Sequence, residues 1–125
     1  MDKAKRISFQ NSLQIHAIGL WESYCEVFPK LVKFDCPKIV LNARFTRTAG
    51  TCNQHDRIVN IGMKFFIKQE NYRPMIDVIL PHELAHQIDF DLFGESEKRC
   101  GHGKNWCMVM EKIGLPANKY HSLEI

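Results

Sequence analysis

The chain has 125 residues, of which 45% are hydrophobic and 25% are charged, as in an ordinary globular domain. These proportions exclude a collagenous, mucin-like or mainly disordered chain, and the length predicts a single domain over residues 1–125. The net charge of +3 permits contact with nucleic acid but does not indicate it.

The cysteines and the hydropathy pattern predict a cytoplasmic protein. The number of cysteines is odd, their spacing is irregular and no C-x-x-C pair occurs, which favours free thiols in a reducing compartment. No apolar run approaches the ~20 residues that cross a bilayer, and the basic start leads into no signal-peptide core. We therefore expect neither export nor membrane insertion. The cysteines are Cys25, Cys36, Cys52, Cys100 and Cys107.

The first half of the chain predicts a helix followed by a small sheet. Apolar residues recur at three-and-four spacing over residues 8–28, which is typical of a helix with one buried face that ends before Pro29. Residues 38–41, 43–45 and 57–61 resemble strands, separated by turn signals, and predict a small antiparallel sheet. Residues 63–69 predict a short helix.

The second half predicts two further helices. Residues 75–93 read as a buried helix, but Pro81 lacks an amide hydrogen and biases Leu80 away from helical angles. Either one kinked helix runs through, or the helix starts at Pro81. Gly94 is a plausible stop, residues 95–103 form a polar loop, and residues 104–113 form a last helix. The fold class is therefore α+β.

The predicted motif helix carries the pattern H-E-x-x-H, at His82, Glu83 and His86. Four helical residues advance ~6 Å and turn ~400°, so the two imidazoles leave one face and can bind one ion. Glu83 lies ~100° further round the helix, outside the ligand set but close enough to take a proton from water. Two imidazoles with a third ligand and an open position favour Zn²⁺.

The third ligand has to come from elsewhere in the chain. A metzincin would have Gly at 89 and His at 92, where this chain has Asp89 and Leu92, so that subclass is excluded. His102 is the best candidate because flanking glycines allow close approach of the backbone, directly before the last helix. The alternatives are a carboxylate or a thiolate site, drawn from Glu95, Glu97, Glu111, Cys100 and Cys107.

These motifs together resemble the bacterial SprT proteins, relatives of the Spartan DNA-protein crosslink proteases. The resemblance rests on L-P-H-E-L-A-H at 80–86, H-G-K-N-W at 102–106, G-L-P-A at 114–117, His121 and T-R-T-A-G-T at 46–51. It implies a minimal zincin-like metallopeptidase domain in which His82, His86 and His102 bind zinc and Glu83 is the general base. It also implies a continuous motif helix through Pro81.

The resemblance implies a zinc endopeptidase that acts on proteins or peptides, including proteins bound or crosslinked to DNA. Family members commonly carry a zinc ribbon of paired cysteines after the protease core, and these 125 residues contain no such pairs. DNA contact is therefore expected from the core itself or not at all. The alternative is a non-catalytic, DNA-associated zinc-binding adaptor, against which the retained Glu83 argues.

Four other features bear on the site. Asp89 could orient a ligand imidazole or be a solvated carboxylate, and His121 could stabilise an oxyanion or lie exposed. Trp106 should pack the last helix against the motif helix. Residues 44–57 should border the cleft as an edge strand and loop, where they could align a peptide by strand addition, contact phosphate or form plain surface.

Overall fold

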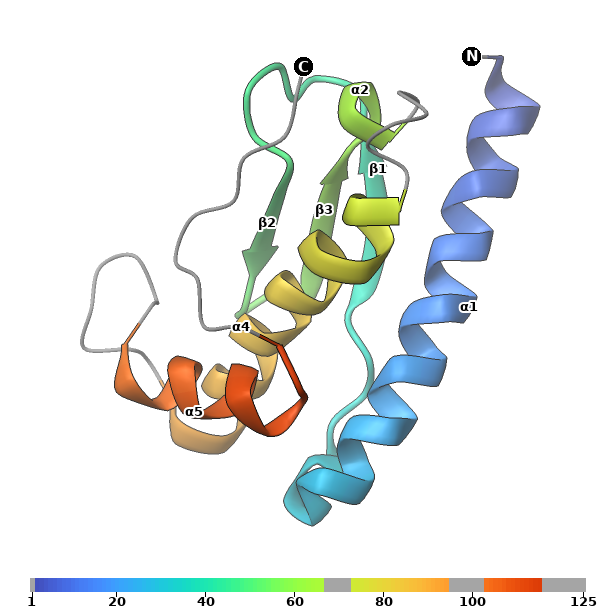
Figure 1. Ribbon diagram of the computed structural model, residues 1–125. Helices are drawn as coiled ribbons and strands as arrows, with labels where there is room; N and C mark the ends of the chain where they lie inside the picture. Colours follow the sequence, from blue (N-terminus) through green and yellow to red (C-terminus); the bar gives the residue numbers. More distant parts are fainter. Residues whose placement is uncertain (1, 67–72, 95–102, 116–125) are drawn as a thin grey trace.

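The computed structural model describes residues 2–66, 73–94 and 103–115, and it confirms the α+β class. Figure 1 shows helix α1 (Lys3–Val27) beside the sheet and helix α5 (Lys104–Lys112) against the end of helix α4 (Leu80–Phe93). In the part of the chain that is described, no helix combines the length and the apolarity needed to cross a membrane.

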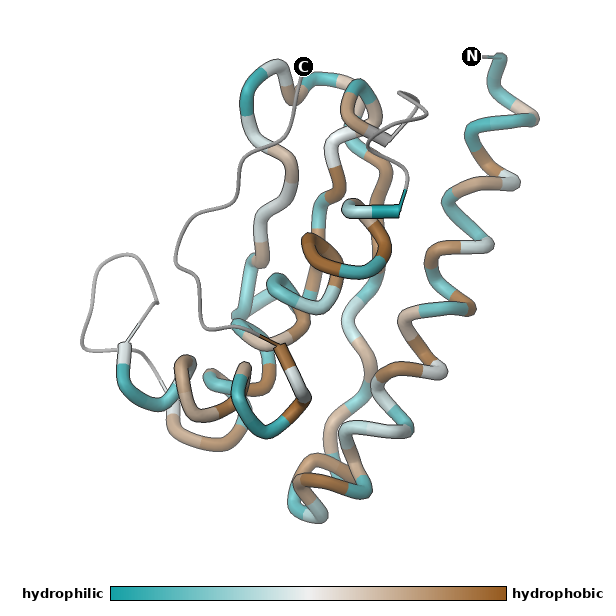
Figure 2. Tube along the Cα trace, in the orientation of Figure 1, coloured by the Kyte–Doolittle hydropathy of each residue, from teal (hydrophilic) through white to brown (hydrophobic). Residues whose placement is uncertain are grey.

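Helix α1 begins five residues before the predicted start. Asp2 caps it, since its Oδ1 accepts a hydrogen bond from the backbone N–H of Lys5 at 2.8 Å. The first turns bury little, so apolar periodicity could not reveal them. Hydrophobic and hydrophilic segments alternate along this helix (Figure 2), as expected for one buried face. That face consists of Leu13, Ala17, Trp21 and Tyr24.

A short 3-10 helix, η1 (Pro29–Lys33), leads into a three-stranded sheet of order β1-β3-β2. Strand β1 (Lys38–Asn42) pairs parallel with β3 (Ile58–Gly62), and β2 (Gly50–Asn53) pairs antiparallel with β3. The predicted wholly antiparallel sheet is therefore wrong. The chain reverses its direction between β1 and β2 and again between β2 and β3, so β3 runs the same way as β1.

The predicted strand at 43–45 is also wrong. These residues leave the sheet in a turn, where Asn42 Oδ1 accepts a hydrogen bond from the backbone N–H of Arg44 at 2.9 Å. This local bond ends β1.

Helix α1 closes the free edge of β1. The backbone N–H groups of Ile39 and Leu41 donate to Gln14 Oε1 and Gln10 Oε1, each at 2.8 Å. These two glutamines lie one helical turn apart, so their side chains reach alternate positions along the strand. Strand β2 is then the remaining edge of the sheet.

Pro81 is accommodated in a continuous helix that changes its hydrogen-bond register. The segment η2 (Met75–Ile79) is a π-helix, and Leu80 donates its N–H to the carbonyl of Met75, five residues back. Ile79 and Leu80 both keep helical angles, so the helix runs through the proline. The π turn supplies the extra residue at the point where Pro81 has no N–H to give.

The helix ends agree with the predicted stops. Gly94 and Gly114 have φ of 79° and 85°, where glycine carries no steric cost, and they follow α4 and α5. Helix α2 (Met63–Phe66) occupies the start of the predicted helix at 63–69, whose remainder lies outside the described residues. Helix α4 is central, since it contacts α1, η1, β2, β3 and α5.

Candidate metal centre

His82, Glu83 and His86 form one buried cluster on α4. Each offers a nitrogen or carboxylate oxygen, and these atoms all lie within 4.8 Å of one another. The two imidazole centroids are 5.0 Å apart. Two imidazoles from one helical turn, with a carboxylate beside them, are a donor set that suits a divalent ion such as zinc.

The cluster is almost fully buried, and this burial raises the pKa of Glu83. The three side chains are 4%, 4% and 8% exposed in sequence order. Burial raises the pKa of Glu83 from its ordinary 4.5 to about 8, because desolvation disfavours the charged carboxylate. A carboxyl group with a pKa near neutrality is suited to accept and return protons.

This raised pKa predicts how the stability of the metal-free protein depends on pH. Between pH 4.5 and 8 the folded state keeps a proton on Glu83 that the unfolded state has released. The corresponding stabilisation is therefore fully present below pH 4.5 and is lost as the pH rises through about 8. Urea unfolding of the metal-free protein should show that the free energy of unfolding falls between pH 4.5 and about 8.

The same measurement on the Glu83→Gln protein should show a shallower fall, because glutamine does not titrate. Asp89→Asn is the control, since burial raises the pKa of Asp89 only to about 6. Its effect should be confined to the lower part of the window. Identical slopes in the wild-type and Glu83→Gln proteins would contradict the assignment.

Trp106 of α5 packs against both motif histidines, which confirms the predicted packing of α5 on α4. Its side chain is fully buried, and its ring stacks on that of His86 with centroids 5.4 Å apart and planes at 19°. It meets the ring of His82 edge-on at 5.0 Å. One aromatic side chain thus restricts the orientation of both imidazoles.

Strand β2 approaches Glu83 at a glycine. A Cβ atom added to Gly50 would lie 2.9 Å from Cγ2 of Ile79, 3.1 Å from Cγ of Glu83 and 3.3 Å from its Oε2. The absence of a side chain at this position therefore lets the edge strand contact the carboxylate.

Gly50→Ala should lower the free energy of unfolding by about 1–3 kcal/mol, because Ile79 is fully buried and overpacked cores must shift. It should also displace the Glu83 carboxylate. Gly19→Ala is the matched control, since nothing lies within 4 Å of its added Cβ and alanine favours helices by ~0.5–1 kcal/mol. Chemical denaturation of both variants measures the contrast, and equal effects would rule out the contact as the cause.

The other residues named from the sequence divide into three groups. Asp89 is 2% exposed, so its reading as a solvated carboxylate is wrong, whereas Glu111 is exposed on α5, outside the cluster. Strand β2 is an edge strand, as expected within 44–57. Cys107 is half-buried on α5 and is not part of the cluster. The other candidates lie outside the described residues: His102, Glu95, Glu97, Cys100 and His121.

Sequence reasoning missed a set of polar side chains around the far end of β2. Gln54 and Gln87 form hydrogen bonds between the β2–β3 turn and α4, and Gln87 also bonds to Asp91 within α4. Gln87 follows His86 directly and is fully buried, so a polar residue on the core face of a predicted helix was the available signal.

Comparison with known proteins agrees with this geometry. The SprT-like family model matches residues 20–122. Protein SprT of Vibrio atlanticus is 35% identical over 94 residues, covering 74% of this chain and 53% of the relative. Protein SprT of Cronobacter sakazakii is 36% identical over 90 residues, covering 71% and 51%.

Protein SprT of Escherichia fergusonii is 32% identical over 108 residues, covering 85% of this chain and 62% of the relative. The chain thus spans about half to three fifths of the length of these curated relatives. No solved structure matches it. With a family match over most of its length and a His-Glu-His cluster on the helix where the motif places it, this chain belongs to the SprT-like family.

Proposed function

We propose that this protein is a zinc-dependent endopeptidase of the SprT type. The observation that carries the proposal is the buried cluster of His82, Glu83 and His86 directly beside the edge strand β2. His82 and His86 would hold the metal, with His102 as the proposed third ligand. Zinc bound there would supply Lewis acidity toward the scissile carbonyl and toward water.

Glu83 would act as the general base. Its carboxyl group becomes a carboxylate more readily once positive charge lies beside it, since an opposite charge within ~4–6 Å lowers a raised pKa. It would then take a proton from the attacking water and deliver it to the leaving amine. Strand β2 borders one side of this site, because Gly50 packs against the side chain of Glu83.

The edges of the sheet support a proposed substrate class. Gln10 and Gln14 accept hydrogen bonds from the outward-facing N–H groups of β1. In contrast, no described strand pairs with the outer edge of β2. An extended polypeptide could therefore add to β2 and pass close to Glu83. We propose unfolded or extended protein segments as substrates, including proteins attached to DNA, in the cytoplasm. Exposed Arg44 and Arg47, before β2, could contact phosphate.

Metal removal tests the proposed function. Dialysis against a chelator should abolish casein hydrolysis, and equimolar zinc should restore it, with single-stranded DNA added in a parallel series. Stimulation by DNA would support action on DNA-bound proteins, whereas equal rates would point to a general peptidase. Hydrolysis that persists in the metal-free protein contradicts the proposal, and zinc binding without cleavage of any substrate identifies an adaptor.

A further inference from the structure

A partly buried polar network links the turn after β2 to helix α4. The side-chain amide of Gln54 donates to the backbone carbonyl of His86 at 2.7 Å, and the amide of Gln87 donates to the carbonyl of Gln54 at 3.1 Å. The turn and the motif helix thus each donate one side-chain hydrogen bond to a backbone carbonyl of the other. One of the bonded carbonyls belongs to a motif histidine.

Gln87 is the centre of this network. Its amide nitrogen also donates to Asp91 Oδ1 at 3.0 Å, and its Oε1 accepts from the thiol of Cys52 at 3.6 Å. The side chain is fully buried. Its partners come from β2, the turn and α4, so these elements cannot shift relative to one another without breaking hydrogen bonds of a fully buried side chain.

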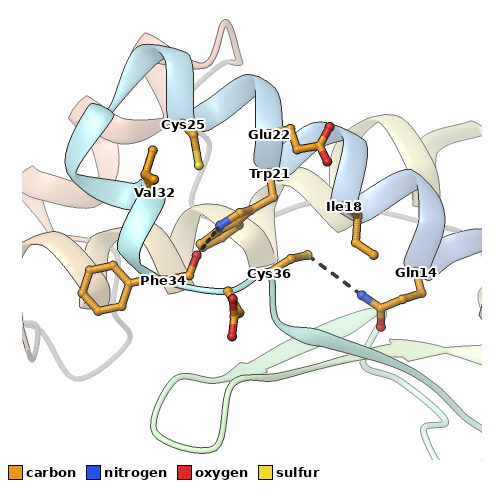
Figure 3. Close-up of a pocket in the computed structure, with 9 residues that line it drawn as sticks. Gln14, Ile18, Trp21, Glu22, Cys25, Val32, Phe34 and Cys36 are labelled. Carbon is orange, nitrogen blue, oxygen red and sulfur yellow. Dashed lines mark hydrogen bonds between the residues drawn. The ribbon is translucent and has the colours of Figure 1, made fainter.

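Arg57 anchors the far end of the turn. Its guanidinium donates to Asp91 Oδ1 at 2.6 Å and to the carbonyl of Asp35, and it lies 5.8 Å and 5.6 Å from the ring centroids of Trp21 and Phe34. These two aromatic residues also line a groove of about 540 Å³ (Figure 3).

The backbone of Arg57 has φ of 57°, a conformation that costs energy in a residue with a side chain. Such strain persists where the surroundings determine it, and here the side chain has partners on several elements. The side-chain contacts of Arg57 therefore hold the backbone of the turn that contains Gln54 in one conformation.

We propose that Gln54 is a positioning residue that holds strand β2 in register with the metal-binding turn of α4. This inference rests on the proposed function. Gly50 contacts Glu83 at one end of β2 and Gln54 contacts His86 just beyond the other, so strand and helix are aligned along the whole site. An extended peptide that pairs with β2 would then reach Glu83 in a fixed register, so loosening the strand would weaken the binding of such a substrate.

The test compares Gln54→Met, which keeps the length of the side chain and removes its donor, with Gln54→Lys, which restores a donor. Asn53→Ala is the matched control, because among the described residues the side chain of Asn53 bonds to Asp56 within the same turn and not to α4. Deuterium uptake of the metal-free protein is measured at the amides of β2, with those of β1 as the internal reference.

Gln54→Met should speed exchange in β2 about three- to tenfold, the worth of one hydrogen bond, and leave β1 unchanged. It should raise KM for casein by a similar factor, with kcat for casein and turnover of a short quenched peptide within about twofold. Gln54→Lys should restore most of both. Unchanged exchange in β2, equal loss on casein and the short peptide, or the same effects from Asn53→Ala would overturn the inference.

Failure of the proposed function gives a different result. The metal-loaded wild-type protein would then cleave neither casein nor the short peptide. The exchange measurement needs no activity, so it still decides whether Gln54 holds β2 against α4.

Discussion

Replacing Glu83 with glutamine is expected to reduce casein hydrolysis by about 10²–10⁴-fold while zinc stays bound. Glutamine has nearly the same shape and fits the same buried site, but its amide cannot accept the proton of the attacking water. The loss should appear mainly in kcat, because the two imidazoles and strand β2 are unchanged.

Zinc stoichiometry and steady-state kinetics measure this result together. Glu26→Gln, at an exposed position of α1, is the control for the loss of one negative charge. Undiminished hydrolysis would remove Glu83 from the mechanism. Loss of zinc from the Glu83→Gln protein would instead make Glu83 a ligand, which its position within 4.8 Å of both histidines permits.

Truncating Trp106 to alanine should destabilise the fold by about 3–5 kcal/mol and weaken zinc binding. The side chain is fully buried between α5 and the two motif histidines, so its removal leaves a cavity beside both imidazoles. The imidazoles would then gain rotational freedom that a bound ion must remove.

Thermal unfolding with and without zinc separates the two effects, because a ligand raises the Tm according to its affinity for the folded state. Trp21→Ala is the matched control, since Trp21 is 4% exposed and bonds to the carbonyl of Phe34, away from the histidines. It should lower the Tm without reducing the shift that zinc produces. If zinc raised the Tm of both variants equally, Trp106 would stabilise the core without affecting zinc binding.

The sequence by itself determined the elements whose signal is local. The three-and-four spacing of apolar residues located α1, the largely apolar stretch over 75–93 located α4, and glycines marked the ends of α4 and α5. The spacing of His82, Glu83 and His86 placed their side chains together, because helix geometry relates residues four apart without help from the rest of the fold.

Tertiary structure decided everything that depends on residues far apart in the chain. The parallel pairing of β1 with β3, the contact of Gly50 with Glu83 and the bond from Arg57 to Asp91 join positions 20 or more residues apart. The same local residue propensities favour parallel and antiparallel strands. A glycine in a strand does not reveal which residue of another element packs against it. Packing of α4 against the sheet determined these contacts. Burial of the apolar face of α4 fixes which polar groups come together and have to form hydrogen bonds with one another.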